Sequence, residues 1–483
     1  MNIVATELPY IDSADLFAKV ADQSWAIFLD SAHLPKQDGL DKSSEKSLES
    51  PPVKPSKNAS FDVLAIKPET TLVFDGEQTR VTDQRGEQCL AGDPLTVLQS
   101  QIPEVDNPEQ LAYVPGAIGY FSYDLARYFE KLPALADNPE QMPAMAMGIY
   151  HVIVVVDHEQ RKTTILQLGT AANTHSLVRQ WRGLIRHCLD DANGERSSER
   201  ELGGLVPDSL QESMSRDDYG NHFKRVREYT IAGDCYQVNL AKQFSAKVTG
   251  NAWSTYRNLR DSSPAPYGAF MNFPFAQVLS NSPESFIQCR DRRVITSPIK
   301  GTRPRDHRNK KLDKANAKAL LNSTKDRAEN LMIVDLMRND LSRCCELGSV
   351  KVPVLFEVHS FANVHHLISQ VSGMLRGQLH ALDLLRSCFP GGSITGAPKI
   401  RAMHIIEELE PTRRGLYCGA IAYVGADGNL ETNIAIRTIV IKDGVARYSA
   451  GGGLVIDSDE ESEYQELLVK SKKMTQALFK NKR

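Results

Sequence analysis

The sequence predicts a mixed α/β protein with two lobes, and three observations lead to that fold class. Its 483 residues exceed what a single hydrophobic core usually serves. Apolar and alternating runs predict strands in the first half, and strand-like and helix-like segments alternate through the second. A polar stretch with three glycines, residues 191–214, separates the halves. We therefore predict an N-terminal region over 1–190, a linker over 191–214, and a second region over 215–478 that carries the chemistry.

Strands dominate the predicted N-terminal region. Trp25–Leu29, Phe61–Ile66 and Thr70–Phe74 have the apolar or alternating pattern of strands. Residues 113–124 combine glycines with aromatic side chains, which suits a tightly packed strand and turn. Residues 151–156 form an apolar run of strand length. These segments predict a sheet in the first half of the chain.

Other segments are predicted to be helical or irregular. Residues 36–60 contain almost no apolar side chains and predict a mobile surface insertion. Residues 175–190 and 216–232 have helical patterns, and the second of these is followed by a strand at 236–240. The segment 323–340 has an apolar face at helical spacing.

Composition excludes several classes of function. Hydrophobic residues make up 41% and charged residues 24% of the chain, ordinary values for a soluble globular protein. The net charge of -3 gives no electrostatic basis for nucleic-acid binding. No apolar run is long enough to span a bilayer, and the first residues lack the pattern of a secretion signal. The eight cysteines are scattered, which favours reduced thiols and a cytoplasmic location.

The segment Thr296–Arg305 places one lysine, Lys300, between an apolar run and a glycine. Pro298 and Pro304 disfavour a helix through it. Gly301 lets the backbone turn and approach whatever the lysine contacts. By itself, a lysine before a glycine is most often a solvated loop residue, so the functional interpretation depends on the other motifs.

Two acidic groups stand on predicted helices of the second region. Glu329 lies near a helix start, where the macrodipole also favours a surface glutamate. Glu463 and Glu466 follow Asp457 and Ser458, either of which can cap a helix, and their spacing directs both carboxylates to one face. That face is either a solvated acidic helix start or a site for a hard divalent cation, best matched by Mg²⁺.

Glycine-rich segments adjoin these helices. Gly391–Lys399 leads into a helix that ends near Pro411, and its backbone N–H groups suit an anion, although it lacks the Walker pattern. Ala450–Gly453 either lets a ligand approach bare backbone or makes a tight connection. Arg437 falls in a predicted strand over 434–439 and, among isoleucines, requires a carboxylate partner.

Taken together, these motifs resemble the chorismate-using enzymes, a family that includes anthranilate, aminodeoxychorismate, isochorismate and salicylate synthases. The resemblance covers nearly the whole chain and is densest from about residue 216 to 470. The segments that carry it are Pro298–Thr302, Asp326–Asn330, Phe389–Lys399 and Ala450–Gly453. It implies a large two-lobed fold in which two β-sheets pack in the core and helices lie outside.

Two positions separate the subfamilies. The water-adding members carry a lysine, as general base, where this chain has Gln237, which speaks against isochorismate or salicylate synthesis. At the position of Lys300, anthranilate synthases carry alanine and aminodeoxychorismate synthases carry lysine. The resemblance therefore implies component I of a bacterial aminodeoxychorismate synthase, which makes 4-amino-4-deoxychorismate for 4-aminobenzoate and folate. Anthranilate synthase component I and a non-catalytic chorismate-binding subunit are the alternatives.

The resemblance also implies roles for individual residues. Lys300 is the expected nucleophile, with Arg303 and Arg305 as candidate cations that keep its amine uncharged, and Glu284 is the expected general acid. The expected Mg²⁺ ligands are Glu329, Glu463 and Glu466. The expected substrate contacts are Arg437, Tyr423, Gly452, Gly453, His366, Thr395, Lys399, Gln237 and Thr302.

Two partners are expected besides chorismate. The chain has no Gly-x-Cys-x-Gly nucleophile elbow, so we expect ammonia from a separate glutamine amidotransferase subunit, in a heterodimer. In some family members a Leu-Glu-Ser strand end helps to bind tryptophan. The corresponding residues here are Leu29, Asp30 and Ser31. A tryptophan site in the N-terminal half is therefore a hypothesis.

Overall fold

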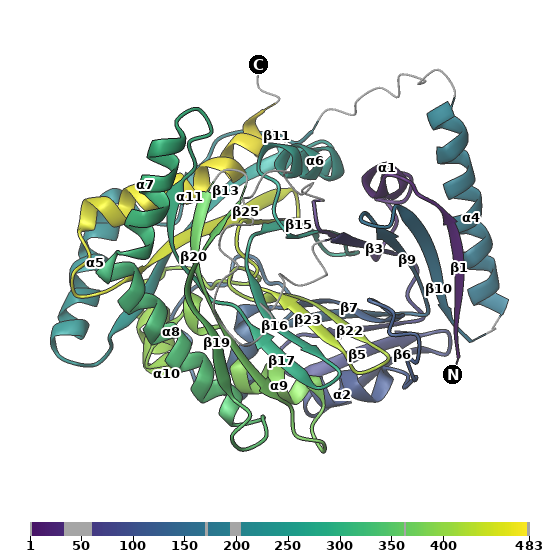
Figure 1. The fold of residues 1–483 in the computed structure, drawn as a ribbon, viewed down its shortest axis with the longest axis horizontal. Helices are drawn as coiled ribbons and strands as arrows, with labels where there is room; N and C mark the ends of the chain where they lie inside the picture. Colours follow the sequence, from purple (N-terminus) through teal and green to yellow (C-terminus); the bar gives the residue numbers. More distant parts are fainter. Residues whose placement is uncertain (1, 33–59, 170–171, 194–203, 362–363, 481–483) are drawn as a thin grey trace.

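A computed structural model describes the chain in the ranges 2–32, 60–169, 172–193, 204–361 and 364–480. Most of the predicted insertion, 36–60, and part of the predicted linker, 194–203, therefore lie outside the described residues. Within these ranges the chain forms two large sheets of antiparallel strand pairs with helices around them (Figure 1). The mixed fold class and the arrangement of two central sheets are as predicted.

The first sheet has 13 strands. In spatial order its path is β1 (Ile3–Pro9), β10 (Lys162–Leu168), β9 (Val152–Asp157), β3 (Phe61–Ala65), β2 (Ala26–Asp30), β14 (Tyr267–Asn272), β15 (Gln277–Ser282), β24 (Thr438–Lys442), β25 (Val445–Leu454), β13 (Gln237–Thr249) and β11 (Val206–Pro207). Two short strands, β12 (Gln211–Glu212) and β21 (Gly396–Ala397), also pair with β13.

The second sheet has 12 strands. Its path is β18 (Ile299–Pro304), β20 (Val364–Met374), β17 (Arg293–Thr296), β16 (Ser285–Arg290), β23 (Leu430–Asn433), β22 (Ala420–Gly425), β7 (Gly116–Phe121), β8 (Met145–Tyr150), β4 (Thr70–Phe74), β5 (Gln78–Asp83) and β6 (Gly86–Ala91). The remaining strand, β19 (Lys351–Ser360), pairs with β20.

Each sheet joins strands from both sides of the predicted linker. In the first sheet the two groups meet where β2 pairs with β14, and in the second where β22 pairs with β7. The ranges 1–190 and 215–478 therefore each supply about half of both sheets, and the two regions fold together.

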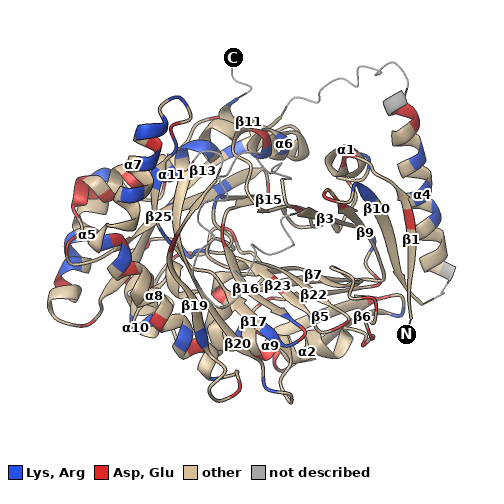
Figure 2. Ribbon diagram, viewed as in Figure 1, with Lys and Arg blue, Asp and Glu red and all other residues tan. Residues whose placement is uncertain are grey.

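The helices lie outside the sheets, and the charged side chains gather mainly on them and on the loops (Figure 2). None of the helices in the described ranges is both long and apolar enough to cross a membrane. The helices are α1 (Ser13–Ala18), α2 (Pro94–Gln101), α3 (Ala126–Phe129), α4 (Ala172–Asn193), α5 (Arg216–Ile231), α6 (Ala252–Ser262), α7 (Lys310–Leu321), α8 (Thr324–Ser342), α9 (Ala381–Cys388), α10 (Lys399–Leu409) and α11 (Glu460–Phe479), with 3-10 turns η3 (Tyr123–Leu125) and η4 (Gly392–Ile394).

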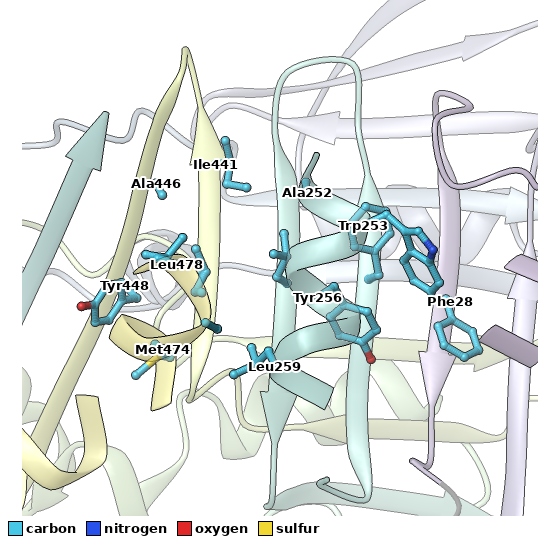
Figure 3. Close-up of a cluster of buried hydrophobic side chains, with 14 of the residues drawn as sticks. Phe28, Ala252, Trp253, Tyr256, Leu259, Ile441, Ala446, Tyr448, Met474 and Leu478 are labelled. Atoms are coloured by element: carbon cyan, nitrogen blue, oxygen red, sulfur yellow. The ribbon is translucent and has the colours of Figure 1, made fainter. Parts of the chain in front are cut away.

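Three large clusters of buried apolar side chains hold these layers together. One fills the space between the sheets, where Ile27 of β2 and Ile118 of β7 belong to the same cluster. Another lies under the helices of the first sheet, and Figure 3 shows α6 and α11 packed there through Trp253 and Leu478. The third packs α8 and α9 onto the second sheet. Burial of this apolar area is the main force that holds the sheets and helices in register.

Crossings between the sheets position two functional candidates. The chain passes from the first sheet to the second between β15 and β16, at Glu284, and returns between β23 and β24, at Arg437. The crossings lie side by side, because the Ile434 N–H donates to the Glu284 carbonyl (3.0 Å) and the Asn281 N–H donates to the Arg437 carbonyl (3.1 Å). The predicted strand over 434–439 is therefore wrong for residues 434–437, because a segment that passes from one sheet to the other cannot keep the hydrogen bonds of a strand pair. Strand β24 begins at Thr438.

Candidate active site

A bulge next to Lys300 shapes the strand that carries it. The two prolines correctly predicted that no helix forms here, and the segment is strand β18. Lys300 and Thr302 pair with consecutive residues of β20, so Gly301 between them has no partner in the ladder. Gly301 has φ 78°, and a Cβ there would lie 2.8 Å from the Asp326 carboxyl carbon. Such bulges redirect side chains near active sites.

The Lys300 side chain is half-buried, and its amine has a partner within the protein. Its Nζ donates to the carbonyl oxygen of Ser393 at 3.2 Å. Burial lowers the pKa of Lys300, the carboxylates of Glu329 and Glu284 oppose that change, and the Lys470 ammonium adds to it. A lysine with a lowered pKa has a larger share of uncharged, nucleophilic amine near neutral pH.

The two arginines that the sequence suggested as the cause of the lowered Lys300 pKa form ion pairs with other residues. Arg303 donates to the Asp326 carboxylate at 2.8 Å, and Arg305 donates to Asp313 at 2.8 Å. The prediction that these arginines lower the Lys300 pKa is therefore wrong, because each is neutralised by its own carboxylate. Desolvation is the main cause instead.

Glu284 is buried at its crossing. Its Oε1 accepts a hydrogen bond from the Ser393 hydroxyl at 3.1 Å. Burial raises the pKa of Glu284, although the Lys300 charge and the Ser393 hydrogen bond oppose the rise. A small cavity that includes Phe286 and Ile434 borders the same carboxyl and accounts for part of its apolar environment. A carboxyl group with a raised pKa suits a general acid.

The charge of Arg437 acts on two other candidate residues, Glu284 and His366. Its φ is 52°, and among the described residues no carboxylate lies within ion-pair distance of it. Burial lowers the pKa of Arg437, against the influence of Glu284. Burial, followed by the Arg437 charge, lowers the pKa of His366 to about 4, so this imidazole is neutral at pH 7. Its Nδ1 forms a hydrogen bond with the Thr302 hydroxyl at 2.9 Å.

Arg437 is half-buried, and a guanidinium that loses much of its hydration without a carboxylate partner is costly unless a ligand supplies the negative charge. The sequence-based expectation that Arg437 needs a carboxylate is thus met by no residue of the described chain. The Arg437 guanidinium is therefore available to an anionic ligand.

The three expected metal ligands are held by lysines. Lys325 Nζ lies 3.4 Å from a Glu463 oxygen and 4.0 Å from a Glu329 oxygen. Lys470 Nζ lies 2.8 Å from Glu466 and also donates to the Gly451 carbonyl at 2.9 Å. Within the described ranges, no three His, Cys, Asp or Glu side chains gather in a metal-binding arrangement. An ammonium between two carboxylates nevertheless marks a position that attracts a cation.

The glycine cluster makes room for polar side chains. A Cβ on Gly453 would lie 2.9 Å from the Gln237 amide, and one on Gly452 would lie 3.2 Å from a Glu463 oxygen. Gln237 is fully buried, and neither atom of its amide has a hydrogen-bond partner in the described chain. Such a group is expected to bind a ligand or water.

Three expected substrate contacts are engaged elsewhere in the fold. The Tyr423 hydroxyl donates to the Val114 carbonyl at 2.7 Å and accepts from the Val114 N–H at 2.8 Å. Lys399 forms an ion pair with Asp340 at 2.6 Å, which ties α10 to α8. The Thr395 hydroxyl donates to the Gly391 carbonyl at 2.9 Å and so stabilises its own loop.

The structure adds residues that the sequence reasoning missed. Lys325 and Lys470 each stand one helical turn from an expected metal ligand, and that four-residue spacing was visible in the sequence. Ser393 and Arg414 gave no such signal. Arg414 donates to both oxygens of Glu410 and to the carbonyl of Ile394, at 2.6 to 2.9 Å.

A second cavity lies at the end of β2. Its lining includes Leu29, Asp30, Ser31, Tyr113, Tyr267 and Tyr423. The Asp30 carboxylate accepts hydrogen bonds from Arg260 at 2.7 Å and from Tyr256 at 2.8 Å. Burial, followed by the neighbouring Asp62, raises the pKa of Asp30 to about 6. Tyr423 therefore lines this cavity rather than the group around Lys300.

Comparison with known proteins gives consistent similarities. The model of the chorismate binding enzyme family matches residues 54–476. Aminodeoxychorismate synthase component 1 from Escherichia coli (strain K12) is 44% identical over 424 residues, which are 87% of this chain and 90% of that protein. Anthranilate synthase component 1 from Pseudomonas aeruginosa is 35% identical over 430 residues, which are 86% of this chain and 87% of that protein.

Solved structures show the same architecture. Anthranilate synthase component I from Streptococcus pneumoniae TIGR4 superposes with a TM-score of 0.77 and 34% identity, covering 90% of this chain and 95% of that one. The menaquinone-specific isochorismate synthase from Escherichia coli has a TM-score of 0.69 at 16% identity, covering 99% of this chain and 95% of that one, and shares the fold.

Proposed function

The chain belongs to the chorismate binding enzymes, and from this premise we propose that it is the aminating component of an aminodeoxychorismate synthase. It converts chorismate and ammonia to 4-amino-4-deoxychorismate and water. The Escherichia coli relative bears this name, and the relatives called anthranilate synthase share fewer residues with this chain.

The observation that carries this proposal is the environment of Lys300. Its amine is desolvated, has a lowered pKa, and lies in the same group as the buried carboxyl of Glu284. A solvated loop lysine would have neither property. By resemblance, an anthranilate synthase has alanine at this position and needs no amine there.

The two groups account for amination at C4 in two steps. The uncharged Lys300 amine forms a bond to C2 of the ring, the ring double bonds shift, and the C4–O bond breaks. Glu284 gives its proton to the leaving hydroxyl, which departs as water. Ammonia then forms the C4–N bond, the C2–N bond breaks, and Lys300 leaves as an amine. Two moderate barriers thus replace one high barrier.

Chorismate is a dianion, and the site offers positive charge in two places. We propose that Arg437 binds the enolpyruvyl carboxylate, because this half-buried guanidinium lacks a carboxylate partner among the described residues. Neutral His366, whose pKa the Arg437 charge helps to lower, is hydrogen-bonded to Thr302, and the two add hydrogen-bonding groups. The bare backbone of Gly452 and Gly453 and the unpaired Gln237 amide complete the proposed contacts.

We propose that Glu329, Glu463 and Glu466 hold Mg²⁺. The fit rests on the Lys325 ammonium, which already stands between two of these carboxylates as a single positive charge. When bound, the metal supplies the positive charge that a ring carboxylate of chorismate requires beside three glutamates.

Ammonia comes, in this proposal, from a separate glutamine amidotransferase subunit. The names of the relatives describe a first component, which implies a second one. Free ammonia at high concentration is expected to replace that subunit in the test tube, because the chemistry at C4 uses ammonia itself.

Product analysis tests the proposal. With chorismate, Mg²⁺ and ammonium at alkaline pH, the purified chain is expected to form 4-amino-4-deoxychorismate, measured by liquid chromatography and mass spectrometry. No pyruvate is expected, as measured with a lactate dehydrogenase assay, and a chelator is expected to stop the reaction. Anthranilate together with pyruvate would contradict the proposal in favour of anthranilate synthase. Substrate binding without turnover, with the amidotransferase and ammonia present, would favour a non-catalytic subunit.

We also propose that the cavity at the end of β2 binds tryptophan. It combines aromatic walls from Tyr113 and Tyr267 with the Asp30 carboxylate, which suits an indole and an ammonium group. Calorimetric titration with L-tryptophan at pH 7.5 is expected to give saturable heat, and D-tryptophan is expected to give none. Since Arg260 already neutralises Asp30, affinity should be modest. Absence of heat with the L-isomer would exclude the site.

A further inference from the structure

We propose that Ser393 is the positioning residue that aligns the nucleophile with the general acid. The inference rests on the proposed function, because it assigns Lys300 and Glu284 their roles in that reaction. One residue contacts both groups through different atoms: its carbonyl oxygen accepts from Lys300 Nζ at 3.2 Å, and its hydroxyl donates to Glu284 Oε1 at 3.1 Å.

Lys300 and Glu284 stand on different parts of the fold, and Ser393 contacts both of them. Lys300 is carried by β18, an outer strand on the path of the second sheet, whereas Glu284 sits at the crossing between β15 and β16. Chorismate must meet an amine at C2 and an acid at the C4 oxygen in the same step. A displacement of about 1 Å between such groups can cost about 100-fold in rate. A residue that contacts both is therefore well placed to fix their separation.

Ser393 is itself held firmly. It lies in η4, whose C-terminal end is fixed where the Thr395 carbonyl accepts from the Asn239 N–H at 2.8 Å. The carbonyl of Ile394, the residue that follows Ser393, accepts from the Arg414 guanidinium at 2.8 Å. On the other side, a Cβ on Gly392 would lie 2.3 Å from Leu336, so η4 packs directly on α8. The loop thus has little freedom to shift away from the pair.

Charged groups from several elements face the pair. Glu284 faces Lys300 from β18 and Lys470 from α11, and it influences Arg437 at the neighbouring crossing and Cys418 just before β22. The Lys300 amine faces the same lysine and two further carboxylates, Glu329 from α8 and Glu466 from α11. The Ile299 N–H also donates to the Glu284 carboxyl. Against this background the Ser393 hydroxyl adds a directed, uncharged donor.

The test compares Ser393→Ala with Ser393→Thr. Alanine keeps the carbonyl that Lys300 uses and removes the donor to Glu284. We expect kcat to fall about tenfold and KM for chorismate to stay within about threefold, because the hydroxyl acts on another enzyme group and not on the substrate. Threonine, which keeps a hydroxyl, is expected to restore most of kcat. Thermal unfolding of both variants is expected to match that of the wild type.

The pH profile separates orientation from folding. A carboxyl group ordinarily titrates at lower pH than a lysine, so we assign the acidic limb of the pH profile to Glu284. The lost hydrogen bond stabilised the ionised carboxylate, so its removal raises the Glu284 pKa, and the acidic limb is expected to move up by about one pH unit. A raised Glu284 pKa alone would increase the plateau rate, because more of the carboxyl group would carry the proton that it donates. A fall in kcat therefore reports lost alignment.

Ser13→Ala is the matched control. The Ser13 hydroxyl also donates to a buried carboxylate, Asp62, in the N-terminal half of the chain. Ser13→Ala is expected to leave kcat and the acidic limb of the pH profile unchanged. If Ser393→Ala also left both unchanged while the wild type made aminodeoxychorismate, the positioning role would be wrong and the proposed function would stand.

A further measurement needs no turnover. Carbodiimides modify protonated carboxyl groups, so peptide mass spectrometry of Glu284 modification against pH reports its pKa directly. The midpoint in Ser393→Ala is expected about one pH unit above the wild-type value. Coincident midpoints would overturn the inference. A wild type that makes no aminated product would overturn the proposed function, whatever the midpoints are.

Discussion

Lys300→Ala is expected to lower kcat for aminodeoxychorismate formation at least about 100-fold, the lower end of what one positioned reacting group contributes. The variant lacks the amine that bonds to C2, so ammonia must displace the C4 hydroxyl directly. The fold should persist, because removal of a desolvated amine leaves only the Ser393 carbonyl without its donor. Turnover with saturating ammonium, followed by chromatography, measures the loss.

The wild type offers a second measurement of the same role. Protein quenched during turnover is expected to carry a chorismate-derived adduct on Lys300, identified by peptide mass spectrometry, and the alanine variant should carry none. Because the folded-state pKa of Lys300 is lowered from 10.5, the uncharged amine needed for adduct formation is populated at lower pH than in an ordinary lysine. Lys310→Ala, on the exposed face of α7, is the control. Full rate in Lys300→Ala would leave the family assignment intact and remove the nucleophile.

Local chemistry explains which elements the sequence could predict. The prolines around Lys300 exclude a helix from steric rules alone, and β18 results. The helix near Arg216 begins with the capping box of Ser215 and Asp218, which is a local motif. Two central sheets could be predicted only through resemblance to a family. No alternation pattern reveals that β2 pairs with β14, more than 200 positions away.

Side-chain partners were the part of the site that sequence could not supply. Arg303 and Arg305 are close to Lys300 in sequence, yet each is neutralised by a carboxylate from another element. Arg437 looked like a strand residue because isoleucines surround it, but the chain changes sheets there. Asp457 and Ser458 seemed able to cap α11, whereas Asp459 does so by accepting from the Ser462 N–H. The errors at the arginines arose where tertiary contacts overrode a local pattern, whereas the cap of α11 differs only by a local shift of one or two residues.

The largest loss of stability is expected from Arg414→Met. Arg414 and Glu410 form a buried ion pair, with 2% and 5% of their side chains exposed. The same guanidinium donates to the carbonyls of Ile394 and Asn239, both at 2.8 Å. Removal of one partner leaves a charge and two carbonyls buried without compensation. We expect the free energy of unfolding to fall by about 3–5 kcal/mol, measured as a lower midpoint in urea.

The double variant Glu410→Met with Arg414→Met decides what the pair contributes. Many buried ion pairs can be replaced by apolar side chains at little cost, because the desolvation penalty disappears with the charges. Here the Glu410 carboxylate also accepts from the Ala241 N–H at 2.9 Å. The double variant thus leaves three backbone groups unsatisfied, at about 1–3 kcal/mol each, and should remain clearly less stable than the wild type. Arg225→Met, at an exposed pair, should not move the midpoint.

A double variant as stable as the wild type would mean that the hydrogen bonds from Arg414 and Glu410 to the backbone contribute nothing to stability. The anchoring of η4 beneath Lys300 would then have to come from the Thr395 and Gly392 contacts alone.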